Sequence, residues 1–224
     1  MNMLKPHKII TRKEIKRDPF LETVDRLEYN FEKNKKTYMN IALAMIAGFF
    51  IINFLLNKQR QKELDSNTAL GTALVAYDNT DYENAKFQFE TIVSEFSGTI
   101  SANIANYYLG KIAYNNNDFN KSKLYLNKYF NDYGIDILVP GTIKMLSDIA
   151  VKDNKPKDAL AILDRGIRLN MNKNINSELK LSKVLILISL GDKKSSNKIL
   201  NDILSDKNMS SSIKQMGEEL IGML

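Results

Sequence analysis

The chain has 224 residues, of which 44% are hydrophobic, with 4 Pro, no Trp, no Cys and a net charge of +6. Without cysteine, disulfides, thiolate metal sites and an N-terminal lipid-modified cysteine are excluded, and the composition favours long helices over a loop-rich β fold. Residues 1–37 hold ten Lys or Arg against six Asp or Glu, whereas residues 58–224 hold twenty-two against twenty. A nucleic-acid-binding protein usually carries its positive charge on the folded domain, so this distribution favours a membrane-proximal tail instead.

The first expected element is a basic cytoplasmic tail with an amphipathic helix, residues 1–37. Asp18-Pro19 has the form of a helix start, with Asp as N-cap and Pro at the first helical position. Apolar residues then recur at helical spacing between acidic ones, at Phe20, Val24, Leu27 and Phe31. The sequence leaves open whether this helix binds lipid, docks on a partner or only stiffens the entry to the next segment.

The second expected element is a transmembrane helix, residues 38–57. The run from Ile41 to Leu56 is sixteen residues long and is broken only by Asn53. Its length of roughly 24 Å approaches the ~30 Å hydrocarbon core of a bilayer, and it lacks the polar stripe of a soluble core helix. Lysine and arginine flank it on both sides, at Lys33, Lys35, Lys36, Lys58, Arg60 and Lys62.

The position of the apolar run predicts an uncleaved anchor with the N-terminus in the cytoplasm. Nearly forty residues precede the run, and no small-x-small cleavage pattern follows it, so it differs from a signal peptide. The ten basic residues of the short N-terminal segment set the orientation by the positive-inside rule. Residues 58–65 are expected to be a linker or helix extension, and in a bacterium the remaining chain would lie in the periplasm.

Residues 66–209 contain a repeat. Four polar turns separate runs with helical patterning, and a small residue opens the helix after each turn. The turns are residues 78–82, 115–119, 152–156 and 191–194, and the small residues are Ala85, Ser122, Ala159 and Ser196. Successive small residues are 37 positions apart each time. The pattern predicts four helical hairpins, each of which buries its apolar stripe against its neighbours.

Other residues fit the same packing. A larger apolar residue stands one turn after each small one and is expected to fill the space between hairpins: Phe89, Leu126, Leu163 and Leu200. Gly110 would cost an isolated helix about 1 kcal/mol relative to Ala, so close helix packing is its expected reason. Residues 210–224 carry Ile213, Met216, Leu220 and Ile221 at helical spacing and are expected to form a capping helix.

These hairpins resemble the tetratricopeptide repeat. The resemblance is carried by Leu109-Gly110 with Ala113 and Tyr114, by Gly191-Asp192, by Tyr82 and Phe119 after the turn aspartates, and by Ala85 and Ala159. Later units depart from the pattern, with Ser147 and Val184 in place of the glycine, and the family's unit is only about 34 residues. The resemblance implies an all-α solenoid of about four hairpins plus a C-terminal capping helix, in which the first helices line a concave groove.

The layout of the whole chain resembles the YfgM-type ancillary subunits of the bacterial Sec translocon. That resemblance implies an inner-membrane protein whose periplasmic repeats act as an adaptor for translocon subunits, periplasmic chaperones or newly exported proteins. The first two units, from Phe87 to Phe130, equally resemble envelope tetratricopeptide proteins of outer-membrane assembly or of the Tol-Pal system. An envelope scaffold that acts by self-association or partner docking therefore stays open as the alternative.

The sequence offers no catalytic or cofactor-binding constellation. His7 is the only histidine, and the ten glycines form no phosphate-binding loop. Neighbouring acids such as Asp78 and Asp81 are better interpreted as turn formers and helix caps than as a cation site. We therefore expect no enzymatic activity, no cofactor and no metal.

What remains is a protein-binding surface. Projection of the first helix of each hairpin places seven residues on the groove wall: Tyr77, Tyr107, Lys111, Tyr114, Asn115, Lys144 and Lys152. Tyrosine suits stacking on an extended peptide, and lysine suits acidic side chains or a terminal carboxylate. The same residues are equally compatible with solvated positions and partly buried rings.

Overall fold

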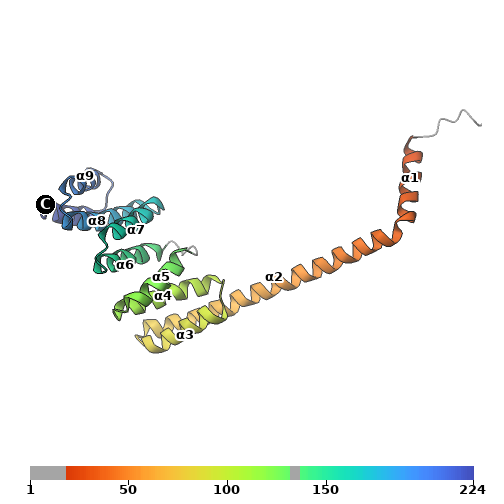
Figure 1. Ribbon diagram of the computed structural model, residues 1–224, viewed down its shortest axis with the longest axis horizontal. Helices are drawn as coiled ribbons and strands as arrows, with labels where there is room; N and C mark the ends of the chain where they lie inside the picture. The colour runs from red at the N-terminus through yellow and green to blue at the C-terminus, as the bar shows by residue number, and fades with distance from the viewer. Residues whose placement is uncertain (1–18, 132–136) are drawn as a thin grey trace, which may run out of the picture. The chain divides into compact units, whose positions relative to one another are not determined.

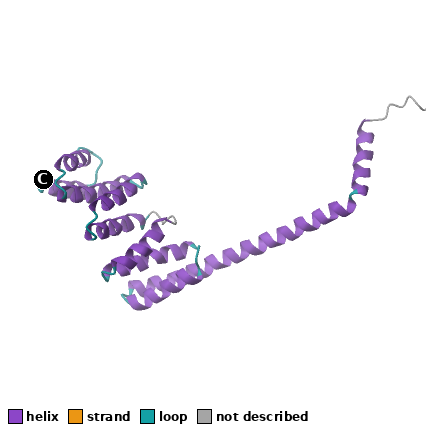
Figure 2. Ribbon diagram, viewed as in Figure 1, coloured by secondary structure: helices purple, strands orange, loops and turns teal. Residues whose placement is uncertain are grey.

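The structure is a computed structural model that describes residues 19–131 and 137–224. Every regular element in these two ranges is an α-helix (Figure 2), which confirms the all-α prediction. The chain divides into two compact units, Met1–Gln59 and Arg60–Leu224. The described residues do not include residues 1–18, which contain basic residues of the tail, His7 and the predicted helix cap Asp18.

The first unit contains the predicted amphipathic helix, α1 (Pro19–Lys33), which begins at the predicted proline. Its apolar side chains are exposed, with 72% of Phe20, 65% of Leu27 and 56% of Phe31 accessible. Within the same unit, the Phe31 ring stacks on Tyr38 at the start of α2 (Lys35–Asp78), with ring centroids 5.7 Å apart.

Helix α2 carries the apolar run and continues without a break to Asp78. An 18-residue window of this helix has a mean hydropathy of 2.2, and none of that window is buried by the rest of the protein. By length and composition, α2 is able to cross a membrane, as the sequence predicts. Residues 58–65 are helical throughout, so the expected linker is an extension of the same helix.

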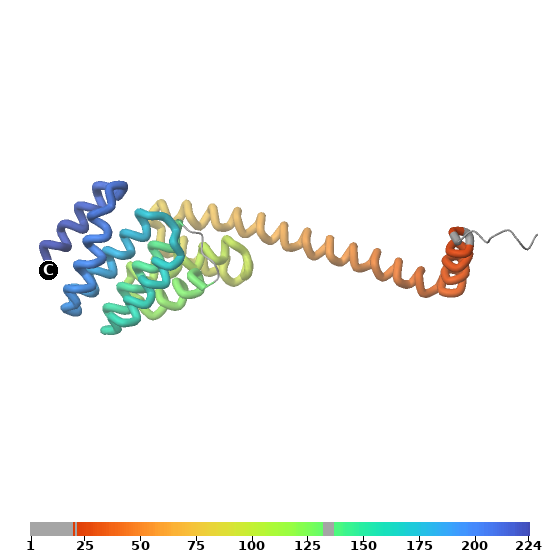
Figure 3. The backbone as a smooth tube through the Cα atoms, turned by 90° about the horizontal axis from the view of Figure 1, so that it is seen from above, coloured from red at the N-terminus to blue at the C-terminus, as the bar shows by residue number. Residues whose placement is uncertain are grey.

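In its described residues, the second unit contains the end of α2 and eight further helices (Figures 1 and 3). These are α3 (Tyr82–Glu95), α4 (Ile100–Asn115), α5 (Phe119–Asn131), α6 (Val139–Lys152), α7 (Pro156–Arg168), α8 (Lys173–Ser189), α9 (Lys193–Leu204) and α10 (Ser211–Ile221). The four predicted turns all fall between helices. Helices α4 and α5, α6 and α7, and α8 and α9 pack as consecutive pairs, and the end of α2 packs on α3 and α4.

The four turns share one backbone conformation. Each has a residue with positive φ, and these residues are again 37 positions apart: Thr80 at 62°, Asn117 at 60°, Asn154 at 61° and Gly191 at 75°. The N–H of the next residue then bonds back to a carbonyl of the preceding helix, from Asp81 to Ala76, Asp118 to Ala113, Lys155 to Ala150 and Asp192 to Leu187, over 2.8–3.0 Å. This pattern satisfies the last carbonyls of each first helix. The 37-residue period is therefore present in the backbone as well as in the sequence.

The predicted packing residues lie in the core of the second unit. The four small residues and the four larger ones are all 0% exposed: Ala85, Ser122, Ala159, Ser196, Phe89, Leu126, Leu163 and Leu200. A Cβ added at Gly110 would lie 2.6 Å from Cγ of Leu126, which explains the glycine by the close approach of α5 to α4. The small-then-large pattern thus sets the separation of the paired helices.

Helix α10 lies within the range of the predicted capping helix but buries only some of its apolar residues. Ile213 and Leu220 are buried, whereas 44% of Met216 and 40% of Ile221 are exposed. The buried stripe instead includes Gly217, where an added Cβ would lie 3.1 Å from Cδ2 of Leu204. Because glycine has no side chain, α10 turns that face towards the core and leaves Met216 and Ile221 outside.

Candidate partner-binding face

The first helices of successive hairpins, namely the end of α2, α4, α6 and α8, contact one another through the side chains that the sequence places on the groove wall. Between α2 and α4, the ammonium of Lys111 lies 5.4 Å from the centre of the Tyr77 ring. The Tyr77 ring also packs edge-on against Tyr108, with centroids 4.9 Å apart. Burial alone would lower the pKa of Lys111, but the hydrogen bond and proximity to the Tyr77 hydroxyl outweigh it and raise that pKa.

Between α4 and α6, Tyr114 donates a hydrogen bond of 2.5 Å from its hydroxyl to Oδ2 of Asp148. Lys152 forms an ion pair with the same carboxylate oxygen, and its ammonium lies 5.1 Å from the centre of the Tyr114 ring. Burial alone would raise the pKa of Asp148, but the hydrogen bonds from Lys152 and Tyr114 hold it below its ordinary value. Burial and the hydrogen bond to Asp148 raise the pKa of Tyr114.

Between α6 and α8, Lys144 forms an ion pair of 2.6 Å with Glu178. We call the row formed by Tyr77, Tyr108, Lys111, Tyr114, Lys144, Asp148, Lys152 and Glu178 the first-helix face. Three of its contacts, Tyr77 with Lys111, Tyr114 with Asp148 and Lys144 with Glu178, each join residues 34 positions apart. The contacts therefore fall three residues, or nearly one helical turn, short of the 37-residue period.

Tyr107 is not part of this face, which corrects the prediction. Only 8% of Tyr107 is exposed, and its ring packs against Tyr129 of α5 at 5.5 Å between centroids. Its hydroxyl packs closely against Gly141 of α6: a Cβ added at Gly141 would lie 3.1 Å from the hydroxyl oxygen. One residue corresponds to 100° of helix rotation, so Tyr108 rather than Tyr107 turns towards Tyr77.

The lysines of the face differ in their charge partners. Lys144 and Lys152 are both paired with carboxylates, so their charges are largely neutralised within the protein. In the part of the chain that the structure describes, Lys111 has no carboxylate within ion-pair distance and contacts tyrosine instead. Asn115 is exposed at the last position of α4. Of the three predicted lysines, Lys111 is therefore the one suited to an acidic ligand.

Three residues of the face, Tyr108, Asp148 and Glu178, are absent from the sequence-based set. The 34-residue spacing is the signal that could have found two of them, because it leads from Tyr114 to Asp148 and from Lys144 to Glu178. That spacing depends on how each hairpin is shifted against the next. The 37-residue spacing of the turns, by itself, does not reveal how far one hairpin is shifted along the next.

A cavity is present elsewhere in the second unit. A cavity of about 420 Å³ lies at the start of α4, where Ser97, Gly98 and Thr99 form one wall and Lys128 of α5 another. Across the described ranges, no three His, Asp or Glu side chains come together as metal ligands would. The first-helix face joins four first helices through exposed or half-buried side chains.

Over the residues that the structure describes, the fold and this face define an all-helical protein with one candidate membrane helix and a domain of consecutive helical hairpins. No protein-family model, curated protein or solved structure matches the chain.

Proposed function

We propose that this chain is a single-span membrane protein whose hairpin domain binds other proteins beside the membrane. One observation carries the proposal: none of the apolar window of α2 is buried inside the protein. The rings of Phe49, Phe50 and Phe54 are 64–69% exposed along it. Exposure of so much apolar surface to water is unfavourable by about 25 cal/mol per Å², and a bilayer removes that cost.

The hairpin domain supplies the binding surface in this proposal. Its turns and buried residues recur at a constant interval, which supports a tetratricopeptide-type solenoid of about four hairpins with a capping helix, although the interval is 37 positions rather than about 34 as in that family. Solenoids present extended surfaces made from equivalent helices. The first-helix face offers half-buried tyrosine rings and the ammonium of Lys111, which has no carboxylate partner among the described residues. These groups suit an extended, acidic or carboxylate-terminated segment of a partner protein.

The particular role we propose is that of a periplasmic adaptor at the bacterial inner membrane. The N-terminal segment would lie in the cytoplasm, and the hairpin domain would link the Sec translocon with chaperones or newly exported proteins. The support is the resemblance in layout to YfgM-type subunits, together with the basic excess before the span. No enzymatic activity and no cofactor form part of this role.

Affinity capture of the tagged full-length protein in mild detergent, followed by mass spectrometry, tests the proposal. A double variant, Lys111→Glu with Lys144→Glu, should lose the partners that the unchanged protein recovers, because it reverses charge on the first-helix face. The loss should be larger at low salt, where electrostatic attraction is screened less.

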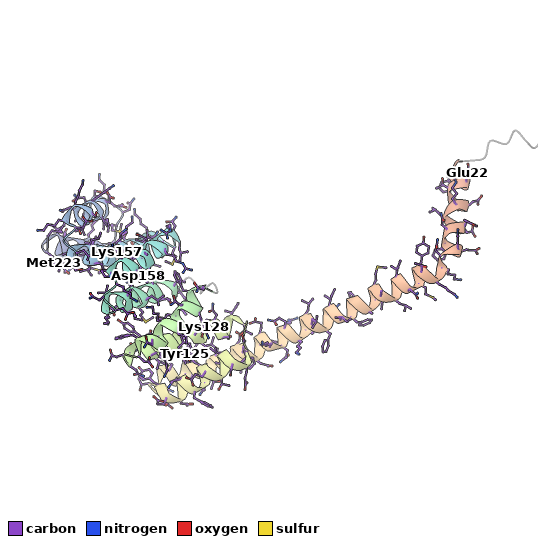
Figure 4. The ribbon with its side chains drawn as sticks, viewed as in Figure 1. Glu22, Tyr125, Lys128, Lys157, Asp158 and Met223 are labelled. Atoms are coloured by element: carbon purple, nitrogen blue, oxygen red, sulfur yellow. The ribbon has the colours of Figure 1, made fainter. Side chains whose placement is uncertain are left out.

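A matched control separates this effect from a general charge effect. Lys121→Glu with Lys128→Glu, on α5 (Lys128 is labelled in Figure 4), makes the same change in net charge and also removes one exposed ion pair, that of Lys121 with Asp118. Partners should stay bound to this control. Equal loss from both double variants would reject the first-helix face as the binding surface.

A further inference from the structure

Asn53 is the one polar residue within the sixteen-residue apolar run of α2. One N–H of its carboxamide donates a hydrogen bond of 3.0 Å to the carbonyl of Phe49, one turn earlier in the same helix. Within the described residues, its second N–H and its carbonyl oxygen Oδ1 have no partner, and the side chain is exposed on the helix surface. The carboxamide therefore presents one donor and one acceptor outwards.

The depth of Asn53 makes those open groups costly in a bilayer. At 1.5 Å per residue, Asn53 lies roughly 7 Å from the middle of the run Ile41–Leu56, which leaves it about 8 Å inside the ~30 Å hydrocarbon core. The short side chain cannot reach water across that distance. An amide without hydrogen bonds in hydrocarbon is unfavourable, so a partner group is expected beside Asn53.

We infer that two copies of this chain associate in the membrane through α2, with Asn53 of one copy hydrogen-bonded to Asn53 of the other. The inference rests on the proposed membrane location of α2. A carboxamide is self-complementary, because the free N–H of each Asn53 can donate to Oδ1 of the other, so that two hydrogen bonds form. A two-fold dimer uses both groups on both chains without requiring a polar residue from a different protein.

The inference also selects one side of the helix. With 3.6 residues per turn, Ile46, Phe49 and Leu56 lie on the same side as Asn53, at seven and four residues before it and three after. Ala44, Gly48 and Ile51 lie on the opposite side. The small residues Ala44 and Gly48 would suit close helix packing there, so the two sides predict different contacts between copies.

Single-cysteine variants of the full-length protein distinguish the two sides, since the natural chain contains no cysteine. In membranes under mild oxidation, Ile46→Cys and Phe49→Cys should form disulfide-linked dimers, whereas Ala44→Cys and Ile51→Cys should associate without forming a disulfide. Asn53→Leu should weaken dimerisation about tenfold, the size expected for loss of an interhelical amide hydrogen bond, and Asn53→Gln should retain it.

A relocated asparagine provides a gain-of-contact control. Combining Asn53→Leu with Ile51→Asn should move the crosslink from Phe49→Cys to Ala44→Cys. Crosslinking from the Ala44 side in the natural sequence, a monomer in the membrane, or a crosslink only to a different protein would each overturn the inference. Extraction by alkaline carbonate is measured on every variant: a protein released from the membrane rejects the proposed membrane location, whereas a retained monomer rejects only the dimer.

Discussion

Ala85 shows how a single small side chain sets the distance between two helices. It is 0% exposed at the start of α3 and packs in the same apolar cluster as Ala73 and Ala76 of α2. The equivalent residues of the later pairs, Ser122, Ala159 and Ser196, are also fully buried. At these positions a larger side chain has no space without displacement of a helix.

A tryptophan at this position should therefore be strongly destabilising. We expect Ala85→Trp to lower the stability of the hairpin domain by several kcal/mol, because the ring must push α3 from α2. Lys121→Trp, on the exposed side of α5, should change stability by less than about 0.5 kcal/mol. Urea unfolding of residues 60–224, monitored by circular dichroism, measures the free energy of unfolding of both variants. Equal losses of stability would show that the proposed packing register is wrong.

The carboxylate of Asp148 should make part of the stability depend on pH. Its folded pKa is lowered, so its contribution is present above the unfolded pKa of about 3.9 and is lost as pH falls through the folded value. The carboxylate is partly exposed, so we expect less than about 1 kcal/mol. Asp148→Asn should be less stable than the unchanged domain at pH 7, and the difference should shrink below pH 4. A difference that stays constant with pH would contradict an ionic contribution.

At the scale of elements, the turns between paired helices have a shared geometry but different residues. The position with positive φ is asparagine in two turns, glycine in one and threonine in the first. Asparagine and glycine tolerate the left-handed region, whereas a β-branched residue is strained there. Aspartate caps the next helix in three of the four turns, with Asp81, Asp118 and Asp192 accepting from backbone N–H groups of Asn84, Lys121 and Ser195.

Exchanging the turn residues should shift stability in opposite directions. Thr80→Asn should stabilise the domain by roughly 0.5–1 kcal/mol, because it removes the strain of threonine at a φ of 62°. Asn117→Thr should destabilise it by a similar amount. Thermal unfolding of residues 60–224 measures the pair. Stabilisation by both substitutions, or by neither, would show that the left-handed turn is not the source of the difference.

At the scale of the whole molecule, the proposed membrane topology is the feature that most constrains which partners can reach the hairpin domain. The ten basic residues before the span predict that residues 1–37 face the cytoplasm and residues 58–224 face away from it. Protease added to intact spheroplasts should therefore digest the hairpin domain and leave an N-terminal fragment. Protection of the domain until the cells are lysed would reverse the orientation.

The sequence by itself determined the helical composition, the apolar run of α2, the positions of the turns and the residues in the tightest packing. These features depend on chemistry within one helix or one turn: apolar periodicity, small residues at a fixed interval, and residues that tolerate positive φ. They are local, so a single chain read in order contains them.

The tertiary structure alone decided which side chains of the candidate face meet. Tyr107 was expected on the surface and is buried, while Tyr108 turns outwards to Tyr77. The sequence places Lys144 and Lys152 where they could bind an acidic ligand, but in the structure they form ion pairs with Glu178 and Asp148. These outcomes depend on the rotation of each helix about its axis and on the 34-residue offset between hairpins. Both are set by the packing of neighbouring helices, and that packing cannot be predicted from any one segment of the sequence.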